Sequence, residues 1–160
     1  MNERSHGITR RSLVRLLAEA ALTGPSPAAI AQETSVTVHK DPNCGCCTGW
    51  VQHLRESGFT VGVEETPDLD SVRTRLGVPP DLAACHTAEV AGYVVEGLVP
   101  AAAVRRLLAE RPNAKGLAVP GMPVGSPGME GGRPAPYMAV LFGADGPRPF
   151  MRFVGDRVAG

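Results

Sequence analysis

The spacing of apolar residues alternates between a period of two and a helical period, and this pattern predicts a mixed α/β domain. We expect three strands, over residues 36–39, 59–63 and 90–99. We expect three helices, over residues 47–57, from Asp68 or Asp70 to Leu76, and from Pro100 through Leu108. This β-α-β-α-β-α order predicts a partly parallel sheet with helices packed against it.

The last third of the chain has a different character. Residues 112–149 contain eight prolines and eight glycines, which predicts mostly ordered turns and loops. Apolar runs at residues 138–142 and 150–154 remain candidate strands. The simplest architecture with a cysteine motif directly after its first strand is a thioredoxin-like sandwich, here with a Gly/Pro-rich irregular C-terminal third.

The first 31 residues resemble an export signal. Arg10 and Arg11 precede a weakly apolar stretch, and Ala29 and Ala31 are the small residues that a signal peptidase accepts. We predict a twin-arginine-type signal peptide over residues 1–31 and a single domain over residues 32–160, located in the periplasm or otherwise exported. The alternative is an amphipathic N-terminal helix, because apolar residues of this stretch also fall near helical spacing.

Charge and hydropathy exclude two classes of partner. The 160-residue chain carries 16 basic and 16 acidic side chains, and residues 32–160 carry 12 and 14. A nucleic-acid-binding protein normally has a basic excess, so we expect no nucleic-acid partner. No apolar run approaches the roughly 18 residues needed to cross a bilayer, so we expect no membrane span.

Three cysteines stand where the first strand ends and the first helix begins: Cys44, Cys46 and Cys47. Backbone N–H groups and the helix dipole at such a place favour thiolates. Cys44 and Cys47 have the spacing that lets two sulfurs face one point. A dithiol redox site needs only two sulfurs, so the thiol of Cys46 needs a different explanation.

The fourth cysteine, Cys85, stands with His86 in the segment before the third predicted strand. In a thioredoxin-like sheet this segment lies beside the start of the first helix, and a thioredoxin carries a proline there that holds thiol substrates. Residues 84–88 contain no proline. The fourth sulfur therefore favours a metal site over a redox site, with His86 as a weaker candidate ligand. We expect His39 and His53 to be a strand-end and a helix-surface residue.

The softness of the donors selects the metal. Four thiolates suit copper(I), zinc or an iron–sulfur cluster. Adjacent Cys46 and Cys47 fit poorly around one tetrahedral zinc ion, whereas thiolates can bridge copper(I) ions in a crowded, polynuclear site. Met122 and Met129 lie in a segment without helical or strand periodicity, and their thioethers are weaker candidate copper ligands. Anchoring of the loop is the alternative role for both methionines.

Two other functions stay open from the residues alone. Four cysteines of an exported protein can form two disulfides in a structural or interaction domain. Cys44 and Cys47 can instead serve a thiol–disulfide oxidoreductase. The pattern favours a metal-binding protein over an enzyme and leaves redox cycling of bound copper open.

Long motifs of the chain are similar to those of the CopG-type periplasmic copper-resistance proteins, also called domain of unknown function 411. The matching segments lie at residues 40–47, 58–59, 84–88, 92–93, 96–97, 99–100, 116–123 and 125–130. The resemblance implies a thioredoxin-like fold that binds copper in a polynuclear thiolate cluster outside the cytoplasm. It carries the ligand role to four residues, Cys44, Cys46, Cys47 and Cys85, and suggests other periplasmic copper-handling proteins as partners.

Overall fold

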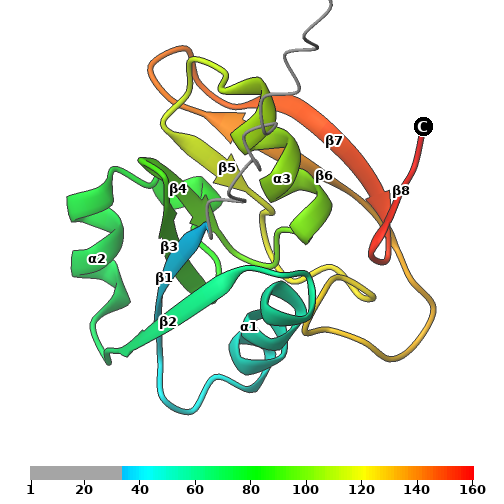
Figure 1. The fold of residues 1–160 in the computed structure, drawn as a ribbon, viewed down its shortest axis with the longest axis horizontal. Coiled ribbons are helices and arrows are strands. Elements are labelled where there is room, and N and C mark those ends of the chain that lie inside the picture. Colours follow the sequence, from blue (N-terminus) through cyan, green and yellow to red (C-terminus); the bar gives the residue numbers. More distant parts are fainter. Residues whose placement is uncertain (1–33) are drawn as a thin grey trace, which may run out of the picture. The chain divides into compact units, whose positions relative to one another are not determined.

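Eight strands form one mixed β-sheet in the described part of the chain, residues 34–160 of a computed structural model (Figure 1). In chain order they are β1 (Ser35–Lys40), β2 (Thr60–Glu65), β3 (His86–Val90), β4 (Tyr93–Glu96), β5 (Gly116–Ala118), β6 (Pro136–Phe142), β7 (Arg148–Val154) and β8 (Arg157–Val158). In space they lie in the order β2-β1-β3-β4-β5-β6-β7-β8. The predicted signal peptide over residues 1–31 lies outside the described residues.

Strand directions confirm the predicted partly parallel sheet. β1 runs parallel to β2 and β4 runs parallel to β5, whereas the other neighbours are antiparallel. Lys40, the last residue of β1, pairs with Glu65 of β2 on one side and with His86 of β3 on the other. The segment that leads to Cys44 therefore leaves the sheet beside the point where the segment carrying Cys85 enters it.

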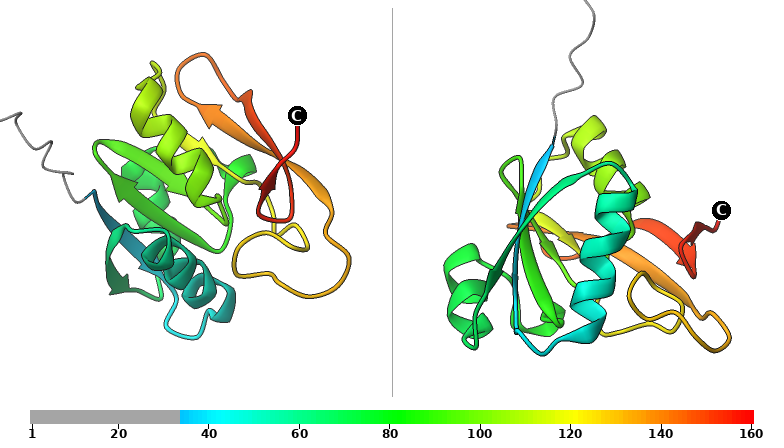
Figure 2. Two further views of the ribbon diagram at one scale, coloured as in Figure 1. Left: turned by 45° about the vertical axis from the view of Figure 1, so that its right-hand side comes forward. Right: turned by 60° about the horizontal axis from the view of Figure 1, so that its bottom comes forward.

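Three α-helices cover the two faces of the sheet (Figure 2). They are α1 (Gly45–Glu56), α2 (Leu69–Leu76) and α3 (Ala101–Glu110), and a short 3-10 turn, η1 (Pro80–Leu82), follows α2. α1 and α3 share one face, and α2 lies on the other. Each face has its own hydrophobic core, and on β4 the adjacent Val94 and Val95 point into different cores, as the alternation of a strand requires.

The ends of α2 follow the signals in the sequence. Asp68 is the N-cap residue, and its Oδ1 accepts a hydrogen bond from the N–H of Ser71 at 3.1 Å. Gly77 ends the helix in the left-handed conformation, with φ of 72°. The predicted helix from Asp68 to Leu76 is thus confirmed, with Asp68 rather than Asp70 as its cap.

The predicted third strand over residues 90–99 is wrong in its bounds. The apolar stretch is a hairpin of β3 and β4, joined by a tight turn at Ala91 and Gly92. Both turn residues have positive φ, 46° and 88°, as a two-residue hairpin of this hand requires. Alanine is uncommon in that conformation, so the composition gives little sign of the turn.

The C-terminal third is more regular than predicted. β6 and β7 confirm the two candidate strands, and β5 and β8 add two more. Residues 119–135 form an irregular loop without helix or strand, as their proline and glycine content predicts. Among the described residues, no helix has the length and apolar character needed to cross a membrane.

Candidate metal centre

Cys44 occupies the N-cap position of α1. Its Sγ accepts a hydrogen bond from the N–H of Cys47 at 3.3 Å, a role that a serine or aspartate oxygen usually fills. Asp41 shapes the preceding turn, because its carbonyl accepts from the N–H of Cys44 at 3.1 Å and its side chain accepts from the N–H of Asn43 at 2.7 Å. The turn therefore places the sulfur of Cys44 at the positive end of the helix dipole.

A buried lysine holds the same turn to the sheet. The Nζ of Lys40 donates hydrogen bonds to the carbonyl oxygens of Asp41 and Pro42 at 3.0 and 3.4 Å. It also lies 3.5 Å from the carboxylate of Glu65 on β2. A lysine is seldom buried without partners, and these partners tie the end of β1 to the loop before Cys44. The sequence gives no sign of this role, because a lysine at the end of a strand usually lies in solvent.

The fold brings all four cysteine sulfurs together, as the sequence analysis expects. The Sγ atoms of Cys44, Cys46, Cys47 and Cys85 all lie within 4.8 Å of one another. Three of them come from the N-cap and the first turn of α1, and the fourth comes from the segment between η1 and β3. The adjacent Cys46 and Cys47 both belong to this group, so one turn of helix presents three sulfurs to the fourth.

The four sulfurs are in two redox states in the structure. Cys44 and Cys47 form a disulfide, whereas Cys46 and Cys85 are free thiols. The Sγ of Cys46 lies 3.5 Å from the Sγ of Cys44. This arrangement allows both disulfide chemistry and, after reduction, ligation of soft metal ions by four thiolates.

Burial differs among the sulfurs and affects their protonation. Cys47 is fully buried, and the other three cysteines are half-buried. Burial, together with the neighbouring thiol of Cys46, raises the pKa of Cys85 to about 12. The free Cys85 thiol is therefore protonated at neutral pH, and a bound metal ion would have to displace its proton.

His86 stands next to the cluster and is fully buried. Its Nδ1 lies 3.4 Å from the Sγ of Cys85, and its ring centroid lies 4.2 Å from that of Trp50. Its Nε2 is buried without a hydrogen-bond partner among the described residues. Burial, with a contribution from the charge of Arg73, lowers the pKa of His86 to about 3, so the ring is neutral. Trp50 donates a hydrogen bond to the carbonyl of Val99 at 2.7 Å, and Cys85 packs against the same core.

The loop of residues 119–135 carries both candidate methionines, and they differ in environment. Met129 is half-buried and packs against the core that also contacts Cys46 and Cys85. Met122 is 55% exposed. The loop reaches the cysteine helix through Gly128, where any Cβ would collide with the carbonyl oxygen of Cys46.

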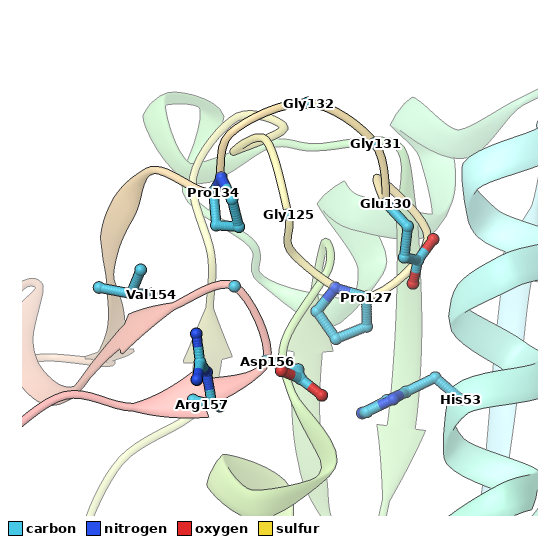
Figure 3. Close-up of a pocket in the computed structure, with 11 residues that line it drawn as sticks. His53, Gly125, Pro127, Glu130, Gly131, Gly132, Pro134, Val154, Asp156 and Arg157 are labelled. Carbon is cyan, nitrogen blue, oxygen red and sulfur yellow. The ribbon is translucent and has the colours of Figure 1, made fainter.

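A cavity of about 260 Å³ lies between this loop, α1 and the turn before β8 (Figure 3). His53 of α1 lines it together with Glu130 and Asp156. The Nε2 of His53 accepts a hydrogen bond from the N–H of Ala101 at 3.0 Å and so caps α3, whose N-cap residue, Pro100, offers no side-chain acceptor. His53 is thus half-buried and structural, which corrects the expectation of a helix-surface residue.

Two effects oppose each other at His53. Burial is the larger and lowers the pKa of His53 below its ordinary value of 6.5. Nearby carboxylates raise the pKa of His53 and so oppose burial; they belong to Asp156, Glu130 and Glu56. The guanidinium of Arg105 lowers the pKa, as burial does. The neutral ring is the form that accepts the hydrogen bond from α3.

His39 is the last residue but one of β1, near the strand end as expected, but it is buried. Its Nδ1 lies 3.2 Å from the carboxylate of Glu64 on β2, and its Nε2 lies 3.0 Å from that of Glu89 on β3. These contacts link three adjacent strands. They give His39 a structural role in the sheet.

The chain is similar to solved structures and to a family profile of known proteins. Two solved structures, both of a copper resistance protein copG and called Form 1 and Form 2, are 44% identical to this chain with a TM-score of 0.72. Their matches cover 78% and 76% of this chain and 100% and 99% of the solved chains. A family profile described as protein of unknown function, DUF411, matches residues 82–129, which include Cys85 and both methionines. No curated protein matches the chain.

Proposed function

The chain belongs to the CopG-type DUF411 family of copper resistance proteins, and from this premise we propose that it binds copper(I) as its cargo in a polynuclear thiolate site. The proposed ligands are Cys44, Cys46, Cys47 and Cys85. One observation carries the proposal: the four sulfurs lie within 4.8 Å of one another, although Cys85 is 38 residues from Cys47.

The donor set and its crowding favour copper(I). Thiolates are soft ligands, and the metals that suit four of them are copper(I), zinc and iron in clusters. Structural zinc sites place four ligands at the corners of a tetrahedron around one ion. Here the sequence neighbours Cys46 and Cys47 both contribute a sulfur to the group, an arrangement that fits poorly around one tetrahedral ion. Sulfurs that bridge several copper(I) ions accommodate such neighbours.

The disulfide and the copper site are then alternative states of one group of sulfurs. An external dithiol can supply the two electrons and two protons that convert the Cys44–Cys47 disulfide into two thiols, and the dithiol itself becomes a disulfide. This gives four thiols together with Cys46 and Cys85. Each thiol that becomes a ligand gives up its proton. Copper loading therefore needs the reduced protein and releases protons.

The Cys44–Cys47 disulfide is also compatible with a second function, that of a thiol–disulfide oxidoreductase. Such an enzyme needs two sulfurs, and two further thiols in contact with them have no part in its chemistry. Cys46 and Cys85 are more simply explained as ligands. We therefore favour copper binding and use the oxidoreductase as an outcome of the test.

We further propose that residues 1–31 direct export to the periplasm and that residues 32–160 form a thioredoxin-like domain. The strand order β2-β1-β3-β4, with β1 parallel to β2 and a β3–β4 hairpin, supports the fold assignment. So does the division of α1 and α3 from α2 by the sheet. In this account the partners are copper ions and other periplasmic copper-handling proteins.

The test is an anaerobic copper(I) titration of the fully reduced protein, with copper per chain and alkylatable thiols counted at saturation. We expect more than one copper per chain and protection of all four thiols. A parallel titration with zinc is the control for general thiolate binding. Two disulfides that form regardless of copper would contradict the proposal, and disulfide reductase activity that needs only Cys44 and Cys47 would support the alternative.

A further inference from the structure

Two side chains from distant elements hold the backbone directly before Cys85. Glu96 of β4 is fully buried, and its Oε1 accepts hydrogen bonds from the N–H of Ala84 at 2.7 Å and from Nε of Arg73 at 3.0 Å. Arg73 lies on α2, and its guanidinium also donates to the carbonyl oxygen of Ala84. Both backbone polar groups of Ala84 are thus bonded to side chains.

The residues directly after Cys85 are held by Glu96 and by the residue that follows it, Gly97. Thr87 donates a hydrogen bond from its hydroxyl to Oε2 of Glu96 at 2.6 Å. The N–H of Gly97 donates to the carbonyl of His86 at 3.0 Å. A Cβ on Gly97 would lie only 2.7 Å from the Cβ of Ala84, so the chain directly after β4 approaches this segment very closely. Cys85 is therefore bracketed by fixed residues on both sides.

We propose that Arg73 and Glu96 are positioning residues of the copper site, which set where the sulfur of Cys85 stands opposite the three sulfurs of α1. The inference rests on the proposed function and deepens it. The carbonyl of Ala84 and the N–H of Cys85 belong to one planar peptide group, so the bond from Arg73 orients the backbone from which the Cys85 side chain projects. The other three proposed ligands lie about forty residues earlier in the sequence, so none of them fixes the position of Cys85 through the chain.

The energetics of the pair support a role in placement. The side chains of Arg73 and Glu96 are 14% and 0% exposed, so both charges are largely removed from water. Burial raises the pKa of Glu96, and the hydrogen bonds from Thr87, Ala84 and Arg73 oppose that effect. A buried ion pair is weak evidence for stability, because uncharged side chains of similar shape often replace it without loss. Stability and sulfur placement can therefore be separated by substitution.

The first experiment needs no metal. In a chain with Cys44→Ser and Cys47→Ser, only Cys46 and Cys85 remain, and their sulfurs lie within 4.8 Å. The protein is equilibrated with glutathione, so that oxidised glutathione accepts two electrons and two protons as the two thiols form a disulfide. The equilibrium constant reports how well the fold holds the two sulfurs together.

The informative variant adds Arg73→Met and Glu96→Gln to this background. It leaves no unpaired charge in the interior, and glutamine still accepts from the N–H of Ala84. The variant removes the bonds of the guanidinium to the Ala84 carbonyl, to Glu96 and to Asp70, and it takes the carboxylate acceptor from Thr87. Of the bonds that Arg73 makes, only the one to the Ala84 carbonyl reaches the backbone directly before Cys85. We expect the equilibrium constant to fall about tenfold, the size of effect that one charge-assisted hydrogen bond can supply. An equilibrium constant equal to that of the parent would overturn the proposal.

Two controls accompany this variant. Glu96→Gln alone keeps the bond of Arg73 to the Ala84 carbonyl but shares the change at Thr87, and it should stay within about twofold of the parent. Arg75→Met changes a neighbouring arginine of α2 whose side chain is 58% exposed. Its contact with the carboxylate of Glu89 is long, at 3.9 Å, so the substitution should leave the equilibrium constant unchanged. Far-ultraviolet circular dichroism verifies the fold of each variant. If the double variant does not fold, Arg73→Lys replaces it, because one ammonium group cannot reproduce the planar set of bonds that the guanidinium makes.

The second experiment uses the chain with all four cysteines and measures the rate at which copper(I) passes to a chelator. We expect Arg73→Met/Glu96→Gln to speed release about tenfold, and to add nothing further when Cys85 is already serine. Additive effects would indicate a general structural role and contradict the proposal. A wild-type protein that binds no copper would end the proposed function, while the glutathione equilibrium would still decide the positioning role.

Discussion

The Cα atom of Gly128 lies 2.9 Å from the point where a Cβ on Gly49 would stand, so the long loop and the cysteine helix touch backbone to backbone. Gly128 has φ of 91°, a conformation that side chains rarely adopt. The loop is held in this shape by its own hydrogen bonds, including those from the N–H of Met129 to Ser126 and of Gly125 to Met129, both at 2.8 Å. The contact supports the first turn of α1 beside Cys46.

Gly128→Ala is therefore expected to disturb both the loop and the cysteine turn. A methyl group there meets the carbonyl oxygen of Cys46 and also carries the cost of a positive φ, together about 3 kcal/mol of unfolding free energy. We expect reduced copper per chain as well, because the displaced turn carries three of the sulfurs. Urea unfolding and copper titration are the measurements.

Gly121→Ala is the matched control for this substitution. Gly121 lies in the same loop with φ of 71°, but nothing lies within 4 Å of its added Cβ. The unfolding free energy of Gly121→Ala should fall by about 1 kcal/mol, and the variant should bind as many copper ions per chain as the wild type. Equal losses of copper in the two variants would contradict a specific contact between Gly128 and the cysteine turn.

His53 links stability to pH. Its native pKa is lowered, so the unfolded chain binds a proton more readily, and the contribution of His53 to stability is present above pH 6.5 and is lost as the pH falls through the native pKa. His53→Gln keeps an acceptor for the N–H of Ala101 and removes the titration, so the unfolding free energy should depend less on pH below 6.5. His53→Ala should lose about 1 kcal/mol at neutral pH, as for other lost helix caps. A His53→Gln protein with an unchanged pH profile would contradict this assignment.

The two methionines make a weaker prediction about the metal. Changing Met122 and Met129 to leucine nearly conserves volume and apolarity, so the fold should be retained. If their thioethers complete the copper site, copper(I) affinity should fall while any zinc affinity stays the same. Single variants separate the exposed Met122 from the half-buried Met129. Unchanged copper affinity in the double variant would assign both residues to loop packing alone.

The convergence of the sulfurs could be predicted from the sequence, because it depends on local signals and on neighbouring strands. The cysteine motif follows β1, Cys85 precedes β3, and these strands pair directly. Asp68 and Gly77 likewise mark the ends of α2 by local chemistry. In contrast, Ala91 gives no sign of the turn that divides the predicted third strand, because its positive φ is imposed by the hairpin.

The polar contacts that support the site could not be predicted in the same way. Arg73 and Glu96 are 23 residues apart, and each looks like an ordinary solvated charge on a helix or a strand. Lys40 has the same appearance at the end of β1. Their roles follow from burial and from partners that only the assembled sheet brings together. The spacing of apolar residues along the chain does not indicate such pairs.

The most direct test of the four-sulfur copper site is the copper(I) stoichiometry of Cys85→Ser, measured anaerobically beside the wild type. Only the fold brings Cys85 to the other three sulfurs, so the substitution removes one ligand without altering the α1 motif. We predict a folded protein that binds fewer copper ions per chain and whose remaining cysteines oxidise faster in air. Cys46→Ser should also lower the copper count, whereas an oxidoreductase would tolerate both changes. Full copper stoichiometry in Cys85→Ser would contradict the four-sulfur site.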